Sequence, residues 1–139
     1  MKRTLTVIVA AIAGVALVAA IASAAPKSAT VVIRHQLRGC HSWSVNGGPF
    51  KPTQSLTLAR GGGVTVIDND VMPHQLIKTS GPAVKFVGKA KMSKIGASTK
   101  IVFAKAGTYR FTTKVGEDYM KGVKTIGEDN VLKLTVKVA

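Results

Sequence analysis

Residues 64–78 read VTVIDNDVMPHQLIK and combine two apolar runs with a polar turn between them. The first run, residues 64–67, is rich in β-branched residues, and the second run, residues 74–78, follows Pro73. β-branched residues favour strands, whereas closely spaced Asp and Asn residues and a proline favour a turn. The stretch therefore predicts two β-strands separated by a turn that ends at His74.

The same pattern recurs along the chain on both sides of this stretch. Further segments of alternating or β-branched residues, bounded by turn residues, lie at 29–37, 42–45, 55–59, 99–104, 108–114 and 131–138. Short strands with frequent turn signals between them are typical of a β-sandwich. We therefore expect an all-β domain of about eight strands arranged in two sheets that pack face to face.

For two connecting segments the sequence predicts alternative structures. The Gly61-Gly62-Gly63 sequence predicts either a hairpin or a bend between the two sheets. Residues 82–98, where lysines are interspersed with Gly and Ala, predict either a short helix or an exposed loop. Within this segment we expect Met92 to contribute to packing.

The N-terminal residues have the pattern of a signal peptide. Lys2 and Arg3 precede a largely apolar run over residues 5–21, which ends in Ala-Ser-Ala at 22–24. A basic start, an apolar run and small residues predict secretion with cleavage before Ala25. An uncleaved anchor is the alternative, because the run is near the short limit for crossing a bilayer. We expect residues 1–24 to be a signal peptide helix and residues 25–139 to be one exported domain, periplasmic or extracellular, without membrane insertion after cleavage.

Length, charge and composition exclude several classes of protein. A chain of 139 residues is too short for a multidomain enzyme, and 46% apolar residues are too many for a disordered tail. Removal of Lys2 and Arg3 leaves 18 basic against 6 acidic residues, so the exported domain carries a charge of +12. The lysines are spread over most predicted strands and aromatic residues are few, which disfavours a nucleic-acid-binding protein.

All six acidic residues occur in close pairs. Asp68 pairs with Asp70, and similar pairs occupy positions 117–118 and 128–129. We expect each pair to lie in a turn rather than on a strand, because turns attract Asp and Glu. The turns of a sandwich gather at its two ends, so the pairs could also share one acidic end.

Sulfur and imidazole side chains converge on three separate predicted turns. The possible donors are His35, Cys40, His41, Met72, His74 and Met120. A thiolate, imidazoles and thioethers form the ligand set that copper prefers over magnesium, calcium or manganese. Each residue alone is more often a packing or surface residue. The convergence predicts a copper site at one end of the domain.

Three segments resemble the cupredoxins, the blue-copper family. The sequence Asp-Asn-Asp-Val-Met-Pro-His at 68–74 resembles the segment that delivers the first copper-ligating His in that family. The sequence Gly-Thr-Tyr-Arg-Phe at 107–111 is similar to the strand that leads into the family's ligand loop, and residues 131–138 are similar to its final strand. Gly-Cys-His-x-Trp and Glu-Asp-Tyr-Met also resemble a divergent subgroup of secreted bacterial cupredoxin-like proteins. The resemblance implies a Greek-key sandwich.

The chain departs from the family at the ligand loop. Thr113 stands where cupredoxins carry the ligand Cys, and no His follows it in the chain. Two alternatives follow: the domain has lost its metal, or ligands have moved to another loop at the same end. The family fold places the turn after the first strand beside the copper end, so Cys40 and His41 could approach His74 there.

If ligands have moved, the site would bind one copper ion that cycles between Cu(I) and Cu(II), with ligands that lie outside the usual ligand loop of the family. His74 and Cys40 are the best candidates, and Met120 is expected as a weak axial thioether. His41 and His35 compete for the remaining position, and we favour His41 by a narrow margin. Consecutive strand residues face opposite sides, so Cys40 and His41 can share an ion only if they lie in a loop.

The predicted function is single-electron transfer by a monomeric, exported, non-enzymatic copper protein. Its partner would be a redox protein or a copper donor or acceptor, which could be acidic, and not nucleic acid. The first alternative is a periplasmic copper carrier or tolerance protein. The second is a metal-free, basic β-sandwich that binds acidic polymers. No catalytic triad or phosphate-binding loop supports an enzyme.

Overall fold

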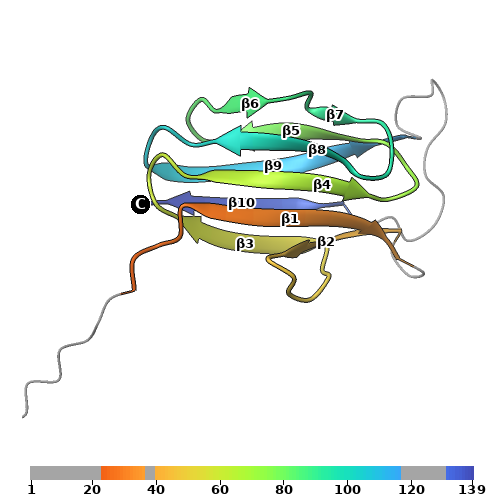
Figure 1. Ribbon diagram of the computed structural model, residues 1–139, viewed down its shortest axis with the longest axis horizontal. Helices are drawn as coiled ribbons and strands as arrows, with labels where there is room; N and C mark the ends of the chain where they lie inside the picture. Colours follow the sequence, from red (N-terminus) through yellow and green to blue (C-terminus); the bar gives the residue numbers. More distant parts are fainter. Residues whose placement is uncertain (1–22, 37–39, 117–130) are drawn as a thin grey trace, which may run out of the picture.

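A computed structural model describes residues 23–36, 40–116 and 131–139 of the protein, and these residues form two layers of strands (Figure 1). The sequence expectation of an all-β, two-sheet sandwich is confirmed. The strands are β1 (Ser28–His35), β2 (His41–Val45), β3 (Thr53–Leu58), β4 (Gly63–Asn69), β5 (His74–Ser80), β6 (Lys85–Val87), β7 (Lys91–Met92), β8 (Ala97–Val102), β9 (Gly107–Val115) and β10 (Lys133–Val138).

Each sheet contains five strands, and the chain crosses repeatedly between the two sheets. The first sheet has the order β2-β1-β4-β8-β6, and the second has the order β3-β10-β9-β5-β7. Most neighbouring strands are antiparallel, but β1 pairs with β4 and β3 pairs with β10 in parallel. Such non-consecutive neighbours are characteristic of the Greek-key arrangement that the sequence resemblance implies.

The inner faces of both sheets form one apolar core. Along β9 the alternation places Tyr109 and Phe111 in the core, while Arg110 between them is exposed. Trp43 of β2 and Phe103 are fully buried in the same cluster. Burying an aromatic or large aliphatic side chain stabilises a fold by about 1.5–3 kcal/mol, so this core holds the two sheets together.

The structure resolves both open connections. Because β3 belongs to the second sheet and β4 to the first, the glycines between them form a bend between sheets and not a hairpin. The expectation of a short helix or an exposed loop over residues 82–98 is corrected, because this segment contains two short edge strands, β6 and β7, which bring the number of strands in the described residues to ten. Met92 is 1% exposed and packs in the core, as expected.

One expectation about the acidic pairs is wrong. Asp68 lies on strand β4, not in a turn, and both Asp68 and Asp70 are buried. Alternation explains this, because Asp68 follows Val64 and Val66 on the inward side of the strand. The other two acidic pairs, and residues 1–22 of the predicted signal peptide, lie outside the described residues. Among the described residues, no helix is long and apolar enough to cross a membrane.

Candidate metal site

Three histidines and one aspartate meet at one end of the sandwich. Strand β1 ends at His35, and its antiparallel neighbour β2 begins at His41, so the two residues are direct cross-strand partners. Strand β4 runs parallel to β1 and ends just before Asp70, and β5 begins at His74 in the other sheet. Figure 1 shows these strand ends at the same end of the molecule. We call His35, His41, Asp70 and His74 the histidine–aspartate cluster.

Local hydrogen bonds fold the turn that carries Asp70. The backbone N–H of Asp70 donates to Asp68 Oδ1 at 3.0 Å, and the backbone N–H of Met72 donates to Asp70 Oδ1 at 3.0 Å. Each bond joins an Asp side chain to the backbone two residues later, which is how Asp initiates a turn. The Asp-Asn-Asp spacing therefore directs the Asp70 carboxylate into the end of the sandwich.

The carboxylate of Asp70 lies at the centre of the cluster. His41 Nδ1 is 2.7 Å from Asp70 Oδ2, and His74 Nε2 is 3.2 Å from the same oxygen. His35 Nδ1 lies 3.6 Å from Asp70 Oδ1. His41, Asp70 and His74 are at most 1% exposed, whereas the His35 side chain is 46% exposed. The cluster is thus a buried site with one imidazole at its mouth.

The ring of His74 is held from two sides. Its Nδ1 lies 3.1 Å from Thr113 Oγ1 on β9, and its ring centroid lies 4.9 Å from that of His41 in an edge-on arrangement. The preceding Pro73 packs closely against Gly116, where an added Cβ would lie 2.7 Å from Pro73 Cδ. Close packing and hydrogen bonding together determine the orientation of His74.

Asp70 is an ionised carboxylate. Burial by itself raises the pKa of the Asp70 carboxyl, but the hydrogen bonds with His41 and His74 outweigh burial and hold the pKa well below its usual value. A carboxylate only accepts hydrogen bonds, so His41 Nδ1–H and His74 Nε2–H are the donors.

The carboxyl of Asp68, two residues before Asp70, has a pKa that is shifted in the opposite direction. Burial raises the pKa of its carboxyl, and the backbone N–H of Asp70 and the charge of His74 only partly oppose that effect. Its Oδ2 atom is buried and has no hydrogen-bond partner among the described residues. The two acids of one predicted pair therefore have contrasting environments.

The residues of the cluster fit a transition-metal ion. One ligand atom each from His35, His41 and Asp70 lies within 4.8 Å of the others. Ligand atoms that share one ion at about 2.0–2.2 Å lie roughly 3–4 Å apart. The distance between His41 Nδ1 and Asp70 Oδ2 must therefore lengthen slightly, and His41 must release its Nδ1 proton or shift it to the other nitrogen. Imidazole and carboxylate ligands suit Cu(II) and Zn(II).

Of the predicted ligands, the structure brings His35, His41 and His74 together around Asp70. His35 and His41, expected as competitors, both approach the carboxylate. Cys40 directly precedes β2 at the same end, is half-buried, and has a φ of 37°. Because it lies outside the strand, alternation does not force Cys40 and His41 to opposite sides. Cys40 is not part of the three-residue group of possible ligands, and Met120 lies outside the described residues.

Sequence reasoning missed Asp70 as a member of the site. It treated Asp70 as a turn residue, and it treated Thr113 only as the replacement for a missing Cys. One signal was present, because Asp70 and His74 flank a short turn that directly follows an apolar strand. That a single carboxylate gathers three imidazoles depends on the pairing of distant strands.

No protein-family model matches the sequence, and no curated protein is a significant match. Among solved structures, the chain is similar to a purple cupredoxin from Nitrosopumilus maritimus, with 18% identity, a TM-score of 0.45, and coverage of 79% of this chain and 98% of that chain. It is also similar to amicyanin from Paracoccus versutus, with 17% identity, a TM-score of 0.41, and coverage of 79% and 81%. These likenesses concern the fold. The described residues themselves form a β-sandwich of two five-stranded sheets.

Proposed function

We propose that the protein is an exported, monomeric copper protein that transfers single electrons to or from a redox partner protein. One copper ion would be held at the histidine–aspartate cluster. Residues 1–24 would direct export to the periplasm or the medium and would then be removed. The protein itself would not be an enzyme.

The convergence of three imidazoles on one buried, ionised carboxylate carries this proposal. Burying an isolated carboxylate costs free energy. Here the hydrogen bonds with two histidines from different sheets offset that cost. Nitrogen and oxygen donors at such separations bind Cu(II) more tightly than other divalent first-row metals. A copper ion bound there would exchange one electron, while the rigid strands on either side would keep its ligands in place.

The copper ion would also have sulfur ligands, from Cys40 and Met120. Cys40 adjoins His41 in sequence, and Met120 follows the end of β9, so both are candidates to approach the cluster. A thiolate or thioether would stabilise Cu(I) relative to an all-nitrogen-and-oxygen site and so make both oxidation states accessible. Participation of Cys40 would also protect an exported thiol from oxidation.

A copper titration of the purified mature chain tests the proposal. We expect one Cu(II) per chain, with an electron paramagnetic resonance spectrum that shows coupling to nitrogen. His41→Gln is expected to weaken Cu(II) binding by about 10-fold or more if His41 is a ligand. Lys100→Gln, on the exposed side of β8, is the matched control and should leave the affinity unchanged.

The visible spectrum tests the sulfur ligand separately. A thiolate bound to Cu(II) absorbs strongly, so Cys40→Ser should abolish the visible band while nitrogen coupling persists. If the band survives this substitution, Cys40 does not bind copper. If the purified chain binds no copper, or His41→Gln binds it as tightly as the native chain, the copper function is refuted.

A copper carrier is the second candidate, and the exposure of His35 favours it. The His35 side chain is 46% exposed at the mouth of the cluster, where another protein could take over its metal. A carrier of Cu(I) would be colourless, and its copper would pass to an acceptor within seconds. An electron-transfer protein would keep its copper and change colour on reduction.

A further inference from the structure

We propose that the outer face of the second sheet binds an acidic polysaccharide whose carboxylates contact Arg110 and Lys133. This site is separate from the histidine–aspartate cluster and goes beyond the proposed copper function. It rests on a groove in the sheet, on the charges that line the groove, and on the absence of carboxylates from the rest of the described surface.

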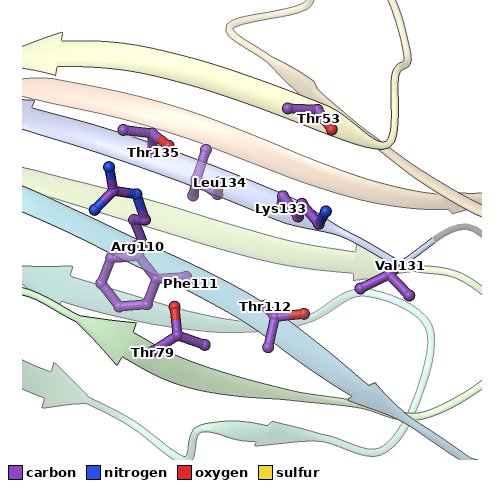
Figure 2. A pocket seen from close by; sticks show the side chains of 9 residues that line it. All are labelled: Thr53, Thr79, Arg110, Phe111, Thr112, Val131, Lys133, Leu134 and Thr135. Carbon is purple, nitrogen blue, oxygen red and sulfur yellow. The ribbon is translucent and has the colours of Figure 1, made fainter.

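The groove crosses strands β3, β10, β9 and β5 and has a volume of about 460 Å³ (Figure 2). Four strands span three interstrand spacings, roughly 14 Å, which is long enough for several units of a polymer. The polar side chains that line the groove are Thr53, Thr79, Thr112, Thr135, Arg110 and Lys133. Phe111, Val131 and Leu134 also line the groove, so its surface is mostly apolar, with hydroxyl groups and two cations among the lining side chains.

The register of the sheet places the two cations on one face as diagonal neighbours. Arg110 of β9 pairs directly with Thr135 of β10, and Lys133 lies two residues before Thr135 on that strand. Diagonal neighbours on adjacent strands are roughly 7–8 Å apart, so the two charges can contact neighbouring acidic groups of one ligand. Figure 2 shows Arg110 and Lys133 on adjacent strands, with Thr112 and Thr135 on the same two strands.

Both cations are available to a ligand. Arg110 and Lys133 are exposed, and neither forms an ion pair with another described residue. The carboxylate side chains of the described part of the chain are those of Asp68 and Asp70, and both are buried. The described surface therefore attracts polyanions and offers no acidic side chain to compete with them.

The chemistry of the groove favours a saccharide over other polyanions. The guanidinium of Arg110 can bind a carboxylate through two parallel hydrogen bonds, and threonine hydroxyls both donate to and accept from sugar hydroxyls. Phe111 is among the lining residues but is only 2% exposed, so the groove offers no aromatic face on which a nucleic-acid base could stack. A carboxylated polysaccharide is the ligand that uses both the cations and the hydroxyls.

Titration of the full chain with tetragalacturonate, at about 0.15 M salt to suppress weak surface attraction, tests this inference. The double variant Arg110→Gln/Lys133→Gln should bind at least 10-fold more weakly. The matched control Lys85→Gln/Lys100→Gln removes the same charge from exposed positions on the other sheet and should change affinity less than 2-fold. Thr112→Val, which keeps the charge and shape, should weaken binding severalfold.

Three outcomes would overturn the inference. Equal losses in the two double variants would mean that the whole cationic surface attracts polyanions without a site. Equal affinity for tetraglutamate, with the same sensitivity to the groove variants, would assign the groove to an acidic peptide. Tighter binding of a sulfated tetrasaccharide would assign it to sulfate. Copper binding should be unchanged in the groove variants. Failure of the polysaccharide-binding inference can therefore be distinguished from failure of the proposed copper function.

Discussion

Replacing Asp70 by Ala tests whether one carboxylate organises the end of the sandwich. The substitution removes the acceptor of hydrogen bonds from His41 at 2.7 Å and His74 at 3.2 Å, and both donors remain buried. It also removes the acceptor of the Met72 backbone N–H, which holds the turn. Asp70→Asn is the milder variant, because it keeps the shape and one acceptor oxygen but loses the charge.

The expected loss follows from these contacts. A hydrogen bond to a charged group contributes about 1.5–3 kcal/mol, and a buried donor left without an acceptor costs a similar amount. We therefore expect Asp70→Ala to lower the free energy of unfolding at pH 7 by roughly 3–5 kcal/mol, and Asp70→Asn by about 1–2 kcal/mol. Against a total of about 5–15 kcal/mol, the first loss is large.

The pH dependence of the stability difference provides a second test of the role of Asp70. The folded state holds the pKa of Asp70 below its unfolded value of 3.8, so its contribution is fully present above that pH and is lost as the pH falls below it. The difference in stability between the native chain and Asp70→Ala should therefore shrink as the pH falls below about 4.

Urea unfolding followed by Trp43 fluorescence measures both quantities. With a slope of about 1–3 kcal/mol per molar urea, the expected loss lowers the midpoint by about 1–5 M. The measurement is made with a chelator present, so that metal binding does not add to stability. A midpoint for Asp70→Ala within experimental error of the native value, or a difference that does not shrink below about pH 4, would refute the central role of this carboxylate.

Three further substitutions have expected outcomes that the same unfolding assay measures. Asp68→Asn should raise stability at pH 7 and lose this advantage near pH 4, because burial raises the pKa of Asp68 and makes its ionised form costly; a loss of more than about 1 kcal/mol would contradict this. Thr113→Val removes the hydroxyl that is hydrogen-bonded to His74 Nδ1, so it should cost about 1 kcal/mol and weaken Cu(II) binding about 10-fold in a titration; unchanged copper affinity would show that this contact does not position the ring. Gly116→Ala places a methyl group 2.7 Å from a ring carbon of Pro73 and should cost about 1–3 kcal/mol, and a fully native midpoint would mean that the turn moves without cost.

The strands themselves were predictable from the sequence. The β-branched alternation in residues 64–78 and its recurrence along the chain predict the two-sheet sandwich, because side chains two residues apart face the same side of a strand. The Pro-His turn places His74 at the start of a strand, as predicted. The short strands β6 and β7 were not predictable, because pairing with β8 and β5 stabilises them more than their own residues do.

The sequence by itself determined that this is a basic β-sandwich with imidazole and sulfur side chains near its turns. Only the tertiary structure decided which of those side chains meet, because that depends on the parallel pairing of β1 with β4 and on the packing of one sheet against the other. This packing gave Asp70 its central position, and strand pairing placed His35 beside His41. The local sequence pattern determines which side chains of a strand face the core. Contacts between distant strands are instead determined by the register and packing of the whole sandwich.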